Sequence, residues 1–211
     1  MIEFRNIIFD LGGVILDIDY IRTIEAFRNL GVENAEFLYS KSSQISLFDN
    51  LEKGNLTEEE FYAGVKKLSN IELSNSQIRN AWNAILIDQK ESIISLLSEL
   101  KINHRLFLLS NTNVIHENAY RSMITFKYGR FIYDDLFEKM YLSHRIHLRK
   151  PDAAIFEYVI NDSGLIKNET CFIDDSPQHV EAARNIGISS FHLKNKSLVE
   201  LIRNAELQFT I

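Results

Sequence analysis

Five short apolar runs, separated by segments with a helical pattern, constrain the fold of this chain more than any other feature. The runs are IIFD at 7–10, RLFLLS at 105–110, KMYLS at 139–143, TCFIDD at 170–175 and SSFHL at 189–193. Strands that are apolar throughout and alternate with helices are typical of a parallel sheet covered on both faces. We therefore predict an α/β fold whose central layer is a parallel sheet.

The long stretch between the first two runs has helical patterns and no strand signal. Capping-box spacing, in which Ser or Thr is followed three residues later by Glu or Gln, occurs at Thr57 and at Ser74. We predict a small helical insertion over residues 20–87 and a core formed by residues 1–19 and 88–211. In the alternative, all these helices belong to one domain.

Two prolines and two glycines predict the bounds of two later helices. Pro151 and Pro177 are each placed in a first helical turn, where the missing N–H group removes no hydrogen bond. Gly164 and Gly187 then end these helices.

The composition is typical of a folded globular protein and favours a small molecule as its partner. With 211 residues, of which 45% are hydrophobic and 25% charged, it is long enough for one main domain plus a modest insertion. A net charge of −6 argues against a general nucleic-acid binder, because such proteins need a basic face. No apolar run approaches the ~20 residues of a membrane helix, and no basic and apolar leader begins the chain. We expect a soluble, cytoplasmic protein with no membrane partner; the sequence does not indicate its oligomeric state.

Polar side chains stand where the apolar runs end. Asp10, Ser110 and the pair Asp174 and Asp175 are at the carboxyl ends of predicted strands, where parallel α/β sheets bind ligands. A structural interpretation exists for each, because Asp also ends strands and forms turns. The adjacent acids repel each other unless a cation or hydrogen bonds compensate, and a divalent metal is the natural compensation. The basic cluster RIHLRK at 145–150 is either a solvated loop or a partner for a single phosphate.

Four segments together resemble the haloacid dehalogenase superfamily over essentially the full length of the chain. FDLGGV at 9–14, LLSNT at 108–112, RKPD at 149–152 and FIDDSPQHVEAARNIG at 172–187 resemble its four motifs in order. The closest likeness is to the phosphatase branch with a small helical cap after the first motif, and DLGGVILDIDY is similar to its alpha-glucose-1-phosphatase-like members. The resemblance implies a Rossmann-like parallel sheet core with a small α-helical cap inserted after the first strand.

The resemblance also implies a catalytic and metal site. Asp10 would be the nucleophile that forms an aspartyl-phosphate, and Lys150 would stabilise its charge. Mg²⁺ would be held by Asp10, by the side chain of Asp175 and by the backbone carbonyl of Gly12, with Asp174 as a supporting group.

The phosphoryl group would be bound by a separate set of donors. The resemblance assigns its oxygens to Ser110 and Asn111, to backbone N–H groups near Leu11 and Gly12, and to Lys150.

Gly12 is a departure from the usual pattern. Typical phosphatases of the superfamily have an Asp there, which protonates the leaving oxygen and later activates water. General acid and base catalysis is worth ~10² to 10⁴ in rate, so its loss weakens chemistry without abolishing it. Asp17 and Asp19 are candidates for the proton donor, although the hinge or surface interpretation is favoured for both. His147 stands where many relatives have glycine.

Together these features predict a Mg²⁺-dependent phosphatase that acts on a small phosphorylated metabolite, such as a sugar phosphate. Two alternatives stay open. One is a non-catalytic or very slow phosphate-binding protein, because Gly12 lacks the acid. The other is a metal-independent haloacid dehalogenase, against which the acidic pair Asp174 and Asp175 argues. Phe48, Tyr62 and Trp82 are aromatic candidates for contact with substrate, but core packing is favoured for them.

Overall fold

The fold is built on a five-stranded parallel sheet. The computed structural model describes residues 4–33, 35, 47–69, 71–194 and 197–203. The strand order is β5-β4-β1-β6-β7, and every neighbouring pair is parallel. The strands are β1 (Asn6–Phe9), β4 (Arg105–Ser110), β5 (Lys139–Leu142), β6 (Thr170–Asp174) and β7 (Ser189–His192). All five apolar runs therefore form strands, and the predicted α/β fold with a parallel Rossmann-like sheet is confirmed.

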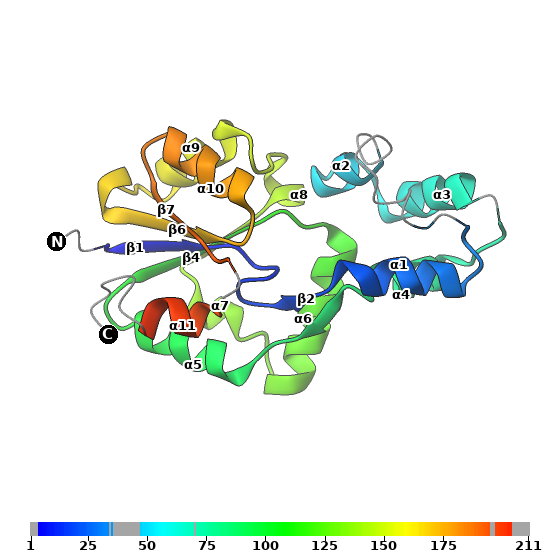
Figure 1. Cartoon of the computed structure of the whole chain (residues 1–211), viewed down its shortest axis with the longest axis horizontal. Coiled ribbons are helices and arrows are strands. Elements are labelled where there is room, and N and C mark those ends of the chain that lie inside the picture. The colour runs from blue at the N-terminus through cyan, green and yellow to red at the C-terminus, as the bar shows by residue number, and fades with distance from the viewer. Residues whose placement is uncertain (1–3, 34, 36–46, 70, 195–196, 204–211) are drawn as a thin grey trace.

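Helices cover both faces of this sheet (Figure 1). On one face lie α9 (Ala153–Asp162) and α10 (Pro177–Asn185), and on the other lie α5 (Glu91–Leu100) and α11 (Leu198–Arg203). The remaining core helices are α6 (Val114–Tyr128), α7 (Tyr133–Leu136), α8 (Ser143–Ile146) and the short 3₁₀ helix η2 (Lys167–Glu169). Alternate residues of β1 face opposite ways, so Ile7 and Phe9 join the apolar cluster with α5 and Ile8 joins the one with α9.

A second group of helices stands beyond the carboxyl ends of the strands (Figure 1). We call it the helical group: α1 (Tyr20–Asn29), α2 (Leu47–Glu52), α3 (Glu58–Ser69) and α4 (Asn75–Asn83). It has its own cluster of buried side chains, including Phe27, Phe61 and Trp82, with Ile115 of α6 packed into it. The predicted division into residues 1–19, 20–87 and 88–211 is consistent with this arrangement and stays a prediction.

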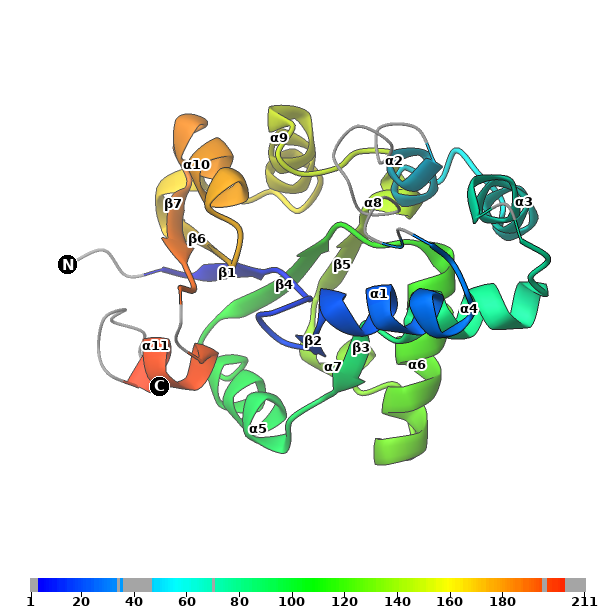
Figure 2. The same cartoon turned by 45° about the vertical axis from the view of Figure 1, so that its right-hand side comes forward.

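A short antiparallel ribbon connects the helical group to the sheet (Figure 2). It pairs β2 (Asp17–Ile18), which follows β1, with β3 (Leu86–Asp88), which precedes α5. The sequence analysis missed both strands, because two or three residues give too short a pattern to recognise. The ribbon brings the outgoing and returning chain together beside the end of β1.

The helix bounds agree with the capping signals, with one correction. The capping box at Ser74 is complete, with its hydroxyl accepting from the Gln77 N–H at 3.2 Å. Pro177 begins α10 as predicted. The prediction that Pro151 lies in a first helical turn is wrong, because α9 begins at Ala153 after a turn at residues 149–152. No helix in the described part of the chain is long and apolar enough to cross a membrane.

Candidate active site

Lys150 lies at the centre of a group of acids at the carboxyl ends of β1 and β6. Its Nζ donates to Asp10 Oδ1 at 2.6 Å, to Asp174 Oδ2 at 2.6 Å and to the Leu109 carbonyl at 2.9 Å. The side chain has no exposed surface, and therefore the solvated-loop interpretation of the basic cluster at 145–150 does not hold for Lys150. A buried ammonium group is stable only when it is paired and hydrogen-bonded as this one is.

The loop that carries Lys150 is fixed to the end of β4. The Asn111 side chain donates to the Lys150 carbonyl at 2.8 Å and accepts from the Lys150 N–H at 2.9 Å. Both ends of this amide are therefore used within the protein. Ser110, also predicted to bind phosphate, is buried and lines the same cavity as Asn111.

The two adjacent acids have different surroundings. Asp174 is fully buried, and its Oδ1 accepts from the Ser176 N–H at 2.7 Å and lies 3.1 Å from His179 Nδ1. Asp175 is exposed at the cavity. Because Asp174 is occupied by Lys150 and His179, the side chain of Asp175 is the freer of the two to meet a ligand.

Three carboxylates converge here and one ammonium group faces them. Oxygen atoms of Asp10, Asp174 and Asp175 all lie within 4.8 Å of one another. Burial, reinforced by Asp174 and opposed by Lys150, raises the pKa of Asp10, and burial with Asp174 raises that of Asp175. Burial and the nearby acids likewise raise the pKa of the Tyr20 phenol to about 12. This negative potential and these oxygen donors fit a hard divalent cation such as Mg²⁺.

The two glycines after Asp10 let the backbone approach this group. Gly13 has a φ of +76°, and a Cβ atom there would lie 2.3 Å from Asp175 Oδ2. A Cβ atom at Gly12 would lie nearest the flexible side chain of Ile18, at 2.8 Å from its Cδ1. Glycine is thus required at Gly13 by its left-handed backbone and by the lack of room for a side chain, whereas the backbone conformation at Gly12 does not require glycine.

A cavity of about 340 Å³ opens from this group toward the helical group. Its lining includes aromatic residues, among them Phe48 and Trp82, and the charged residues Asp49, Glu52 and Arg149. The rings of Phe48 and Trp82 stack with their centroids 5.0 Å apart. Both residues belong to the core of the helical group and also line the cavity. Tyr62 is buried, as expected, and does not line the cavity.

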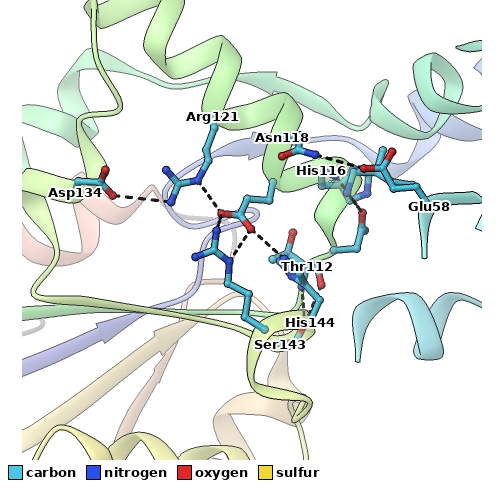
Figure 3. Close-up of polar contacts among 12 residues, drawn as sticks. Glu58, Thr112, His116, Asn118, Arg121, Asp134, Ser143 and His144 are labelled. Atoms are coloured by element: carbon cyan, nitrogen blue, oxygen red, sulfur yellow. Dashed lines mark hydrogen bonds and ion pairs between the residues drawn. The ribbon is translucent and has the colours of Figure 1, made fainter. Parts of the chain in front are cut away.

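Short helix α8 is held beside the start of α6 by polar contacts of Ser143 and His144 (Figure 3). The Ser143 hydroxyl donates to the Thr112 carbonyl and accepts from the Thr112 N–H, both at 2.9 Å. His144 Nε2 and Arg145 Nε each lie 3.0 Å from the buried carboxylate of Glu117 on α6. These contacts tie the first three residues of α8 to Thr112, just before α6, and to Glu117 in its first turn, and so the loop after α8 has a fixed starting point.

The other predicted candidates have structural partners. Asp17 pairs with Lys90 at 2.7 Å, and Asp19 accepts from the Ile21 N–H as the N-cap of α1. Neither lines the cavity. His147 has a left-handed backbone with a φ of 56°, a conformation that glycine adopts without strain. In the basic cluster RIHLRK, Arg149 and Lys150 both pair with acids of the site.

Several residues at the cavity were not predicted from the sequence. They are His179, His116, Asp49 and Glu52. His179 had a readable signal, since it follows Asp174 within the first turn after Pro177. Arg149 belongs to the basic cluster at 145–150, but its contact with Asp49 had no signal, because the two residues meet across 100 positions of sequence.

Comparison with known proteins places these observations in a family. A family model described as haloacid dehalogenase-like hydrolase matches residues 7–193. A D-ribitol-5-phosphate phosphatase from Bacteroides thetaiotaomicron is 31% identical over 191 residues, covering 90% of this chain and 92% of the relative.

Two solved structures have the same fold. A haloacid dehalogenase family enzyme from Bacteroides thetaiotaomicron, solved with magnesium and inorganic phosphate, has a TM-score of 0.84 at 34% identity, covering 95% of this chain and 100% of that one. A haloacid dehalogenase-like hydrolase from Porphyromonas gingivalis has a TM-score of 0.86 at 32% identity, covering 97% and 99%.

Proposed function

Because this chain belongs to the haloacid dehalogenase-like hydrolases, we propose that it is a Mg²⁺-dependent phosphatase that transfers the phosphoryl group of a small sugar or polyol phosphate to Asp10. The observation that carries the proposal is the buried Lys150, paired with Asp174 and with Asp10, which lines the cavity. The relative named for D-ribitol 5-phosphate supports a phosphatase with a small phosphorylated substrate.

Asp10 is suited to attack phosphorus. Its Oδ2 takes no part in the contact with Lys150, which is made by Oδ1. In the first step a bond forms between an Asp10 oxygen and phosphorus, and the bond from phosphorus to the alcohol oxygen breaks. Water then attacks the aspartyl-phosphate, releases inorganic phosphate and restores the carboxylate. Lys150 remains against Asp10 throughout and offsets charge on the transferred group.

The magnesium ion would be held by Asp10 and Asp175, with the Gly12 carbonyl as a further ligand and Asp174 in support. When bound, it neutralises charge on the phosphoryl oxygens. Backbone N–H groups near Leu11 and Gly12, together with Ser110, complete the cradle for those oxygens. Asn111 acts differently in this proposal, because its amide holds Lys150 in place.

Gly12 has no carboxylate that could donate a proton to the leaving alcohol oxygen. The first step is then favoured for alcohols that leave without a proton, and breakdown of the aspartyl-phosphate becomes slow. The same feature would characterise a phosphate-binding protein without turnover, and a direct assay distinguishes the two.

The assay is hydrolysis of a panel of sugar phosphates, D-ribitol 5-phosphate and an aryl phosphate with Mg²⁺. We expect turnover that is lost with a chelator and in Asp10→Asn. Asp135→Asn, at an exposed ion pair with Arg130, is the matched control and keeps activity. Turnover that survives both chelation and Asp10→Asn would contradict the proposal, and tight phosphate binding with no turnover would favour the binding protein.

A further inference from the structure

One wall of the cavity has charged residues that take no part in the proposed phosphoryl transfer. Asp49 and Glu52 come from α2, and Arg149 is the residue before Lys150. Arg149 Nη1 donates to Asp49, and Arg149 Nη2 lies 2.8 Å from Glu52 Oε2. Two carboxylates thus share one guanidinium group, so the wall carries net negative charge.

The wall has a fixed position, because α2 is docked on the loop before Lys150. His147 Nδ1 donates to the Lys53 carbonyl at 2.7 Å, just after α2. Gly54 follows with a φ of +67°, and a Cβ atom there would lie 2.1 Å from the His144 carbonyl oxygen. The acids of α2 therefore face the cavity from a constrained position.

The two acids of this wall are only partly buried and depend on one cation. Asp49 and Glu52 keep 32% and 26% of their side-chain surface accessible, and both contact the guanidinium group of Arg149. Burial also raises the pKa of Glu52, against the opposing effect of Arg149. Both acids line the cavity, and their carboxylates are therefore placed to accept hydrogen bonds from a ligand there.

A hydroxyl group is the ligand chemistry that suits these acids. It can donate to a carboxylate oxygen at the cavity, whereas a second carboxylate or phosphate can only accept. Such an anion would also be repelled by the two acids, and the guanidinium group is already paired. Phe48 and Trp82, which also line the cavity, offer an apolar surface for the carbon chain.

We propose that Glu52, with Asp49 and Arg149, is the specificity-determining wall of the active site, which binds hydroxyl groups of an uncharged polyhydroxy alcohol and excludes substrates with a second anionic group. This inference rests on the proposed phosphatase function. It adds which part of the molecule recognises the alcohol and what that part rejects.

The test compares two substrates that differ at the end remote from the phosphate: D-ribitol 5-phosphate and 5-phospho-D-ribonate, which has a carboxylate in place of the terminal CH₂OH. We expect kcat/KM to favour the polyol by about tenfold or more. Glu52→Gln keeps the shape and removes the charge, and should reduce this preference about tenfold. Glu72→Gln, at an exposed acid of the helical group outside the cavity, is the control and leaves the preference unchanged.

Each outcome decides a separate point. Equal kcat/KM values for the two substrates, or an unchanged ratio of these values in Glu52→Gln, would contradict the proposed role of the wall in specificity. Neither result would contradict the proposed phosphatase function. No hydrolysis of these or of an aryl phosphate with Mg²⁺ overturns the proposed function and this inference with it. Should circular dichroism show that Glu52→Gln is unfolded, Asp49→Asn serves as the second variant and is expected to shift the preference in the same direction.

Discussion

At the scale of single residues, Lys150 explains how three acids can be gathered in one place. A buried charge is expensive to desolvate, and removing one partner of a buried pair typically costs about 3–5 kcal/mol. Lys150 offsets that cost for Asp10 and Asp174 while Asp175 stays at the cavity. The site therefore keeps unneutralised negative charge where a metal ion is proposed to bind.

Gly13 gives a prediction at the same scale. An alanine at a positive φ costs about 1–2 kcal/mol of backbone strain, and at Gly13 its Cβ would also displace Asp175. We expect Gly13→Ala to raise the Mg²⁺ concentration for half-maximal activity by about tenfold or more. Steady-state rates in a Mg²⁺ titration measure it.

Gly164→Ala is the matched control for Gly13→Ala. Gly164 has a φ of +60° with no atom within 4 Å of an added Cβ. It should show a similar loss in the free energy of unfolding with an unchanged Mg²⁺ requirement. Equal Mg²⁺ requirements in both variants would show that Asp175 is not held close to Gly13.

At the scale of elements, α4 of the helical group meets α6 of the core through an aromatic stack. Trp82 and His116 lie with ring centroids 4.9 Å apart, and His116 Nδ1 donates to the Asn83 side chain at 3.0 Å. Burial lowers the pKa of His116 to about 3, so the imidazole is neutral in the folded protein at ordinary pH.

This contact predicts an acid sensitivity. The unfolded chain protonates His116 near pH 6.5 while the folded protein does so only near 3, and therefore stability falls as pH falls between those values. From pH 6.5 to 5, the wild type should lose about 2 kcal/mol more than His116→Gln in the free energy of unfolding. Urea unfolding with a chelator present measures both, and parallel pH curves would contradict the low pKa.

The sequence was enough to predict elements whose pattern is local. Each strand is an uninterrupted apolar run, and each capping box needs only residues three positions apart, which is why β1 and α4 were found. The ends of parallel strands share one edge of a sheet, and so Asp10 and Asp174 were expected to meet. The wall of Asp49 and Arg149 was not, because it depends on how α2 docks, and no local pattern encodes that contact.

At the scale of the whole molecule, the sheet and the helical group contribute different residues to the cavity. The carboxyl ends of the strands supply Asp10, Asp174 and Asp175, while residues of the helical group, such as Phe48 and Trp82, line the cavity beside Asp10 and Asp175. Both sides meet in one short loop, where Arg149 contacts α2 and Lys150 contacts Asp10. In the proposed function, substrate recognition and phosphoryl transfer are therefore adjacent along the chain as well as in space.

The most direct test of this account is a rapid-quench experiment with an aryl phosphate and Mg²⁺, followed by mass spectrometry of the peptide that contains Asp10. We expect a burst of released alcohol equal to the enzyme concentration and a phosphoryl adduct on Asp10, because Gly12 leaves the second step without its usual base. A linear release of alcohol, with no covalent adduct at any quench time, would contradict transfer to Asp10.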